Sequence, residues 1–208
     1  LDTHTLPRHP FYPDAPAQSA RIPMVIGNTR DETRAFLGND EANFALTWDA
    51  LPQKLREQQY VDLSPDVVIA EYRRLYPDDT PSEVFFAATT AGRSWRGAVE
   101  ELEVRAAQGR NTWTYQLDWY PHDVEGSERT RAFHTLDIPL VFDTIAQPDS
   151  RTGTSDDARA VAAAMRDALL AFARSGDPRT GATSAWAPYS LARRETMVFG
   201  QTPVMQDD

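Results

Sequence analysis

Residues 22–32 read Ile-Pro-Met-Val-Ile-Gly-Asn-Thr-Arg-Asp-Glu, and this stretch carries the clearest indication of the fold. Its apolar run ends at Gly27 and gives way to a polar turn that holds two carboxylates, Asp31 and Glu32. Strands that are apolar on both faces are typical of buried parallel sheets, whose functional residues lie beyond the carboxyl ends of the strands. The stretch therefore predicts a buried strand over 22–27 that delivers an acid to the edge of an α/β sheet.

A second strand-like stretch leads to a histidine. Residues 112–119 alternate aromatic and polar side chains, residues 120–131 form a polar loop, and His134 follows. An acid after one strand and a histidine after a later strand is the order in which α/β-hydrolases present the last two members of a catalytic triad. In that fold the nucleophilic serine comes earlier in the chain. Glu32 and His134 are thus the candidate acid and base.

Four blocks of sequence carry a resemblance to a known family, and they run through essentially the whole chain. They are residues 6–11 (Leu-Pro-Arg-His-Pro-Phe), residues 22–36 with the Asp-Glu pair and Phe36, residues 134–142, and a last block made of 171–178, 186–189 and 196–199. In this order they resemble the C-terminal part of a type B carboxylesterase, the cholinesterase-like family that includes bacterial para-nitrobenzyl esterases. The resemblance implies an α/β-hydrolase fold and hydrolysis of carboxylic esters by a Ser-Glu-His triad.

The resemblance also implies roles for single residues. Glu32 would be the triad acid and His134 the general base, and a histidine suits that role because it titrates near neutral pH. Spacing alone favours the structural alternatives, in which Glu32 is a helix N-terminal carboxylate and His134 is a structural loop residue. Phe36 matches an aromatic that lines the acyl pocket, although core packing is an equal alternative. Asp31 is expected to face away, as a capping or ion-paired group. One departure is Arg131, at a position where the family often has glycine.

The nucleophile of the expected triad is missing from this sequence. A nucleophile elbow requires Gly-x-Ser-x-Gly between a strand and a helix. The nearest stretch, 92–97, has one residue too many and follows no strand, so Ser94 is interpreted as a helix N-cap. A glycine-rich oxyanion loop is also absent from the sequence. Because the chain starts at Leu1 without methionine, it is interpreted as a piece of a longer enzyme whose N-terminal part supplies the serine and the oxyanion hole.

The remaining organisation is helix-rich. Residues 1–20 are proline-rich and predict an extended loop, whereas 40–110 predict a helical insertion or cap region within one domain that spans 1–208. Asp137 is predicted to cap a short helix to Phe142, and Ser155 to cap the longest helix, over about 156–174. Residues 196–199 predict a last short strand. Two or three strands are too few for a complete sheet, so its remainder is expected in the absent N-terminal part.

Composition excludes several classes of function. The net charge is −10, and no cluster of Lys or Arg is long enough to follow a phosphate backbone, so nucleic acid is not an expected partner. The chain has no cysteine, and no pair of histidines has the spacing of a metal site. No apolar run approaches the ~20 residues that span a bilayer. We therefore expect no metal, no cofactor and no membrane span, while the compartment, cytoplasmic or secreted, stays open for a soluble protein.

Three functions compete on these observations. The first is the C-terminal portion of a serine carboxylesterase that acts on a small carboxylic ester. The second is a non-catalytic member of the same fold with a binding or adhesion role, since fold alone does not certify chemistry. The third is an independent helical interaction module, which the apolar strand disfavours because its edges would be exposed to aggregation. The presence of both Glu32 and His134 favours the first.

Overall fold

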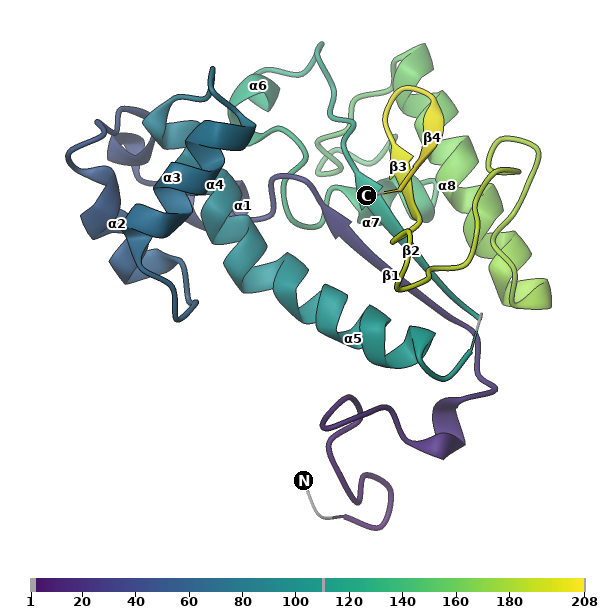
Figure 1. Cartoon of the computed structure of the whole chain (residues 1–208). Coiled ribbons are helices and arrows are strands. Elements are labelled where there is room, and N and C mark those ends of the chain that lie inside the picture. The colour runs from purple at the N-terminus through teal and green to yellow at the C-terminus, as the bar shows by residue number, and fades with distance from the viewer. Residues whose placement is uncertain (1–2, 110, 208) are drawn as a thin grey trace.

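The computed structural model describes residues 3–109 and 111–207, and within them a single sheet of four strands organises the chain. The strands are β1 (Met24–Thr29), β2 (Thr112–Leu117), β3 (Thr196–Phe199) and β4 (Pro203–Gln206), in the spatial order β1-β2-β3-β4. The first three run parallel, and β4 turns back antiparallel along β3 (Figure 1). The chain thus has the partial α/β fold expected from its sequence.

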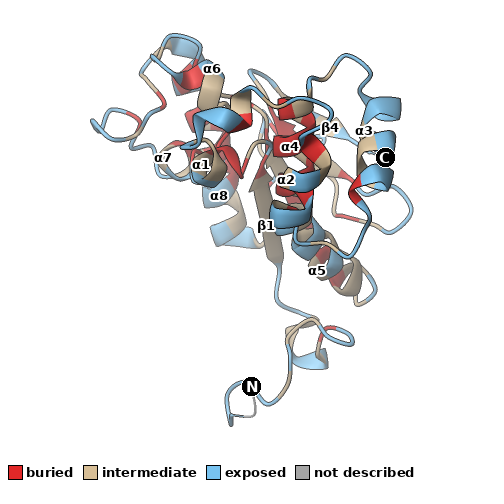
Figure 2. Ribbon diagram, turned by 90° about the vertical axis from the view of Figure 1, so that its left-hand side faces the viewer, coloured by how far each residue is buried: buried red, intermediate tan, exposed pale blue. Residues whose placement is uncertain are grey.

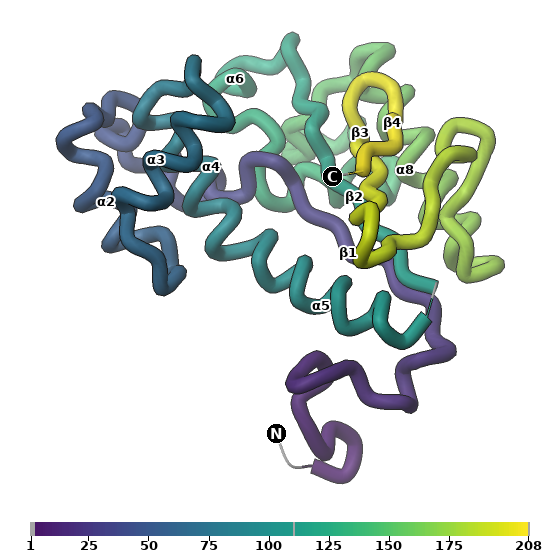
Figure 3. The backbone as a smooth tube through the Cα atoms, viewed as in Figure 1, coloured from purple at the N-terminus to yellow at the C-terminus, as the bar shows by residue number. Residues whose placement is uncertain are grey.

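Helices cover both faces of this sheet. The helix α8 (Asp156–Ser175) packs on the face that carries Val25 and Tyr115, and the two elements enclose an apolar cavity of about 250 Å³. The helix α5 (Arg96–Ala106) lies along the opposite face, beside Thr114 and Gln116, as the tube of Figure 3 shows. Successive side chains of a strand point to opposite faces, so this alternation along β2 fixes which helix each residue meets.

The main hydrophobic core lies between the sheet and α8. It contains Trp113, Trp119 and Trp186, each no more than 6% exposed. The N-cap of α8 is Ser155, whose hydroxyl accepts the backbone N–H of Ala158, as predicted. At the other end of α8, Gly176 has a positive φ of 76° that favours glycine.

A second core joins the helices that follow β1. After the short helix α1 (Arg34–Leu37) come α2 (Leu51–Gln58), α3 (Pro65–Leu75) and α4 (Pro81–Thr90). Figure 2 shows buried residues gathered on α4. The buried residues of this second core are Leu51, Leu55, Val84, Phe85, Phe86 and Ala88. A capping box starts α4, because Thr80 and Glu83 satisfy each other's backbone N–H groups.

The interpretation of Ser94 as an N-cap is wrong. Helix α4 continues through a π-helical turn, Ala91–Trp95, directly into α5, so Ser94 lies inside one long helical run. Its hydroxyl instead accepts a hydrogen bond of 2.8 Å from the side-chain amide of Asn28 on β1. The indole N–H of Trp95 likewise donates to the carbonyl of Thr29, at 3.3 Å. The wider turn thus directs two consecutive side chains onto the strand.

The short elements differ from the sequence prediction in three further places. Asp137 is the first residue of α7 (Asp137–Val141) and not its cap, since Leu136 holds the N-cap position without a side-chain bond. The loop 120–131 contains one helical turn, α6 (Ser127–Thr130). Strand β1 begins and ends two residues later than predicted, because the polar Asn28 and Thr29 still pair with β2.

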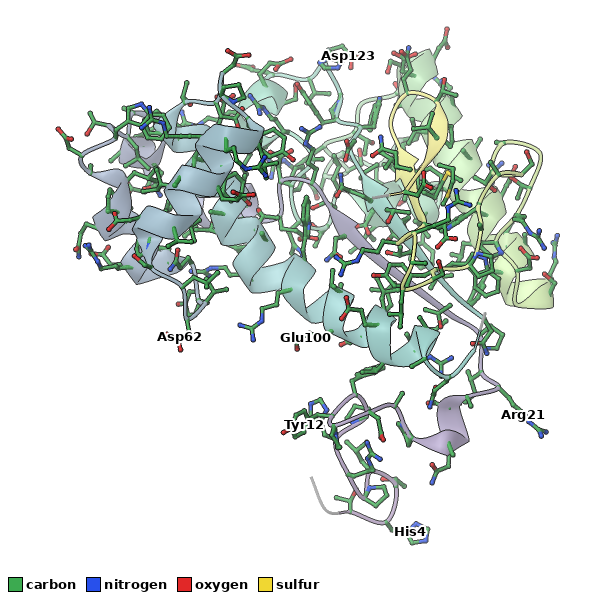
Figure 4. The ribbon with its side chains drawn as sticks, in the orientation of Figure 1. His4, Tyr12, Arg21, Asp62, Glu100 and Asp123 are labelled. Atoms are coloured by element: carbon green, nitrogen blue, oxygen red, sulfur yellow. The ribbon has the colours of Figure 1, made fainter. Side chains whose placement is uncertain are left out.

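The two remaining short elements are 3-10 turns, Ala17–Ser19 and Glu41–Phe44. The N-terminal segment extends away from the sheet, with His4 at its outer end (Figure 4). In the part of the chain that the structure describes, no helix combines the length and apolarity that crossing a bilayer would need.

Replacement of Gly27 by alanine should destabilise this fold. Gly27 pairs with Tyr115 across β1 and β2, and a Cβ added at Gly27 would lie 2.0 Å from the Tyr115 ring. We expect the free energy of unfolding to fall by about 1–3 kcal/mol, the usual range for overpacking a filled site. Urea unfolding followed by circular dichroism measures it. The control is Gly97→Ala on α5, where an added Cβ meets no atom within 4 Å. Equal stability of the two variants would contradict the expected close packing.

Candidate active site

The acid predicted from the sequence lies directly beyond the carboxyl end of β1. Glu32 is only 5% exposed. Its Oε1 accepts the backbone N–H of Thr29, the last residue of the strand, at 2.8 Å. A buried carboxylate needs hydrogen-bond donors to offset its lost hydration, and the backbone N–H supplies one at a fixed position. The strand end therefore sets the direction in which the second oxygen points.

That second oxygen meets His134. The Nδ1 of the imidazole lies 2.5 Å from Oε2 of Glu32, although the two residues are 102 positions apart in the sequence. A backbone bond of 2.9 Å from the N–H of Asp31 to the carbonyl of Ala132 joins the two loops beside this contact. The side chain of His134 is 49% exposed, whereas that of Glu32 is 7% exposed. The pair thus has a buried acid and a histidine whose ring reaches the surface.

Phe36 lies next to the histidine ring. The two ring centroids are 5.0 Å apart, and the planes are tilted by 42°. Phe36 is 53% exposed, so among the described residues it belongs to neither hydrophobic core. Its ring limits the space on one side of the imidazole. Of the two alternatives left by the sequence, core packing is the one that this exposure disfavours.

Tyr115 and Asp137 form a polar contact that the sequence analysis missed. The phenol of Tyr115 on β2 donates a 2.8 Å hydrogen bond to Oδ2 of Asp137, three residues after His134. Burial raises the pKa of Tyr115 well above its ordinary 10, and the negative charges of Asp137 and Glu32 raise it further. The phenol therefore stays protonated and remains a donor. It fixes the start of α7 immediately after the histidine.

The neighbour of the acid, Asp31, faces a different partner. Its carboxylate pairs with Arg34 at 3.0 Å, which confirms the ion-paired role expected for it. Burial raises the pKa of Asp31 in spite of this pair, and burial also lowers the pKa of Arg34. The guanidinium in addition donates to the carbonyl of Arg129 at 2.8 Å. The pair thus connects the acid loop to α6, which precedes the histidine.

Buried hydroxyl groups attach the acid loop to the helical region. The hydroxyl of Thr33 lies within 3.0 Å of the carbonyl of Phe86 and of the hydroxyls of Thr89 and Thr90 on α4. The backbone N–H of Thr33 also donates to Thr90 at 3.2 Å. Because Thr33 directly follows Glu32, these bonds to α4 fix the position of the loop that carries the acid. Isolated threonines of this kind give no pattern by which a sequence could reveal the contact.

Comparison with known proteins supplies the context for this geometry. The sequence profile of the carboxylesterase family matches residues 1–208. The chain belongs to the carboxylesterase family. It is 26% identical to the para-nitrobenzyl esterase of Bacillus subtilis (strain 168) over 211 residues, which cover all of this chain and 40% of that protein. It is 30% identical to the fumonisin B1 esterase of Sphingopyxis macrogoltabida over 202 residues, 90% of this chain and 34% of that protein.

The fold of this carboxylesterase-family chain is also similar to solved structures. The carboxylesterase EST55 of Geobacillus stearothermophilus superposes with a TM-score of 0.73 at 28% identity, over 89% of this chain and 38% of that one. A para-nitrobenzyl esterase structure superposes with a TM-score of 0.63 at 25% identity, over 90% of this chain. The chain therefore spans about two fifths of the length of these relatives.

The backbone around the histidine of this carboxylesterase-family chain adopts two conformations that are rare outside glycine. Arg131 has φ 48° and ψ −140°, and Thr135 has φ 77°. Positive φ is disfavoured by the Cβ of an ordinary residue and most of all for a β-branched residue such as threonine. Each such residue costs on the order of 1–3 kcal/mol and persists only where its surroundings hold it. His134 thus lies between two strained positions.

The other histidines lie apart from this pair. His122 contacts Glu128 at 3.0 Å on the surface, where both side chains are more than two thirds exposed. His4 and His9 are in the N-terminal segment, outside the sheet. Among residues 3–109 and 111–207, no three His, Asp or Glu side chains come together as a metal site would require. The sequence of this family member also contains no Gly-x-Ser-x-Gly.

Proposed function

We propose that this chain supplies the acid, Glu32, and the base, His134, of a serine-dependent carboxylic ester hydrolase. The observation that carries the proposal is the 2.5 Å contact between Nδ1 of His134 and Oε2 of Glu32, with the other carboxylate oxygen held by a backbone N–H. Membership of the carboxylesterase family supports the reaction class. The substrate is a small molecule that contains a carboxylic ester.

In this proposal Glu32 acts on one nitrogen of the imidazole and the nucleophilic serine acts at the other. The carboxylate accepts the Nδ1–H, which fixes the tautomer with a lone pair on Nε2 and stabilises the imidazolium that forms later. The side chain of His134 is half exposed, so the far edge of its ring is accessible from the surface. Among the described residues no hydrogen bond occupies Nε2, so that nitrogen is able to accept a proton from a hydroxyl group brought against it.

The reaction then follows the two halves of acyl transfer. The serine Oγ forms a bond to the ester carbonyl carbon while its proton passes to Nε2 of His134, and the tetrahedral intermediate expels the alcohol, which takes that proton. A water molecule next gives its proton to Nε2 and attacks the acyl-serine. Collapse of the second intermediate releases the carboxylic acid and returns the proton to the serine. Both steps use His134 first as base and then as acid.

The proposed serine and oxyanion donors come from outside residues 1–208, from another segment of the same polypeptide. The absence of Gly-x-Ser-x-Gly from these residues motivates this part of the proposal. The test is to read the coding sequence that adjoins residues 1–208, express the complete polypeptide and measure hydrolysis of para-nitrophenyl acetate. A fluorophosphonate should label one serine, and peptide mass spectrometry locates it. A folded polypeptide that neither turns over esters nor becomes labelled would favour the binding or adhesion alternative.

The 208-residue chain tested by itself should give no serine-dependent turnover. Histidines react slowly with activated esters, so the expected rate on para-nitrophenyl acetate is that of a surface imidazole, and it should be insensitive to organophosphates. The measurement compares the chain with and without prior organophosphate treatment. Organophosphate-sensitive turnover traced to a serine of this chain would show that the nucleophile lies within these residues.

A further inference from the structure

The residue three positions before His134 has an unusual backbone conformation and contacts a side chain that is distant in the sequence. Arg131 follows α6 with φ 48° and ψ −140°, a backbone region outside αL that is occupied almost only by glycine. Its backbone N–H donates to the carbonyl of Ser127 at 2.6 Å, and its carbonyl accepts the N–H of Phe133 at 2.9 Å. These bonds turn the chain sharply toward the histidine, but they would form equally well with glycine.

The arginine side chain makes a contact that glycine could not make. Its Nη2 lies 3.1 Å from Oε1 of Glu83, the third residue of α4, and both side chains are about one third exposed. The other oxygen of Glu83, Oε2, accepts from the backbone N–H and the hydroxyl of Thr80 in the capping box, at 2.9 and 3.0 Å. Glu83 is thus a fixed anchor, because the start of a rigid helix determines where its carboxylate lies.

The charges around Arg131 also favour its ion pair with Glu83. Asp31 and Glu83 both attract the guanidinium, and the opposing positive charge is Arg34, which is already paired with Asp31. Burial lowers the pKa of Arg131, but the hydrogen bond that it donates to Glu83 and the negative charges of Asp31 and Glu83 outweigh this effect, so the side chain stays charged. Release of the arginine would therefore cost an ion pair and allow the backbone to relax to a negative φ.

We propose that Arg131 is a positioning residue for His134: its ion pair with Glu83 holds the histidine loop in the strained turn that brings the imidazole to Glu32. This inference rests on the proposed function for its kinetic consequences, whereas its geometric consequence does not. Glycine would adopt this backbone conformation by itself, whereas Arg131 adopts it because its side chain is anchored to Glu83. The position of the histidine accordingly depends on α4, a helix of the neighbouring region.

The decisive experiment compares Arg131→Ala with Arg131→Gly in the complete protein. Both remove the ion pair, but only alanine keeps a Cβ that disfavours positive φ. In the alanine variant kcat for para-nitrophenyl acetate should fall about tenfold relative to the glycine variant, with KM unchanged, because fewer molecules hold His134 against Glu32. The glycine variant should retain a kcat close to that of the unaltered protein. Equal kcat values for alanine and glycine would overturn the proposal.

A second pair of variants tests the anchor without touching the loop. Glu83→Gln keeps an oxygen for the capping box but places a neutral amide opposite Arg131, so kcat should fall about threefold to fivefold. Adding Arg131→Gly to Glu83→Gln should restore the kcat of the Arg131→Gly variant, since glycine needs no anchor. The matched control is Glu71→Gln, which removes the same charge from the exposed pair with Arg74 on α3 and should leave kcat unchanged. Failure of glycine to rescue Glu83→Gln would also overturn the proposal.

A spectroscopic readout separates this inference from the proposed function. The Nδ1 proton of His134, in its hydrogen bond to Glu32, should give a low-field ¹H resonance in ¹⁵N-histidine-labelled protein. The resonance should weaken in Arg131→Ala and persist in Arg131→Gly, whether or not the protein hydrolyses esters. Absence of ester turnover together with this pattern would leave the positioning role intact and refute only the esterase. The same resonance in both variants would refute the positioning role, whatever the activity.

Discussion

Replacement of His134 by alanine should lower kcat for ester hydrolysis by about 10⁴–10⁶-fold in the complete enzyme, because both proton transfers of the proposed mechanism pass through its imidazole. The variant should remain folded, since the side chain is half exposed and lies outside the hydrophobic cores. Turnover of para-nitrophenyl acetate, with fluorophosphonate labelling as a second readout, measures the loss.

The matched control for this prediction is His122→Ala. His122 also contacts a carboxylate through Nδ1, that of Glu128, but the pair is exposed and lies apart from Glu32. Its loss should leave kcat within a factor of about two, in keeping with the small effect of exposed ion pairs. Full activity in the His134→Ala protein would remove this histidine from the mechanism and leave the loop as a structural element.

Replacement of Glu32 by glutamine should lower kcat by about 10³–10⁴-fold, less than loss of the histidine, because the imidazole is still present but badly oriented. Glutamine retains the shape of the side chain and an oxygen for the Thr29 N–H. If that oxygen takes the backbone bond, the amide NH₂ faces Nδ1, and this favours the tautomer that carries its proton on Nε2. That tautomer has no lone pair for the serine proton.

Two measurements check this second prediction. The kcat on para-nitrophenyl acetate should fall while the free energy of unfolding changes little, and the low-field ¹H resonance of His134 should disappear. The control is Glu128→Gln, which makes the same change in the surface pair with His122. A Glu32→Gln protein with kcat reduced no more than the Glu128→Gln protein would show that the buried carboxylate has no part in proton transfer.

Sequence periodicity captured the elements whose own residues determine them. Helix α8 has its cap, its apolar stripe and its terminal glycine in one continuous stretch, so both of its ends were predicted. Strand β4 was missed because Pro203–Gln206 is short and begins with proline, and its identity comes only from pairing with β3. Ser94 was misplaced because a helix that passes through a π turn carries no stop signal at that point.

The candidate site likewise has residues that the sequence indicates and contacts that only the structure shows. Glu32 and His134 stand out as candidates because each follows a recognisable strand, and a carboxylate followed by a histidine is the order of a known fold. Their contacts with Thr29, Thr33 and Tyr115 were beyond sequence reasoning, since they depend on where separate elements meet. The absence of glycine at position 131 was visible, but its meaning required the backbone angle and the position of Glu83.

The contacts that connect the acid loop, helix α4 and the histidine loop all lie between residues 29 and 137. In laboratory recombination of related genes, crossovers between residues 29 and 137 should therefore be less well tolerated than crossovers outside them. A crossover inside that interval would combine an acid from one parent with a histidine turn shaped by another, and the mismatched anchors would spoil their alignment. Crossovers on either side would transmit the Glu32–His134 pair together with the contacts that hold it.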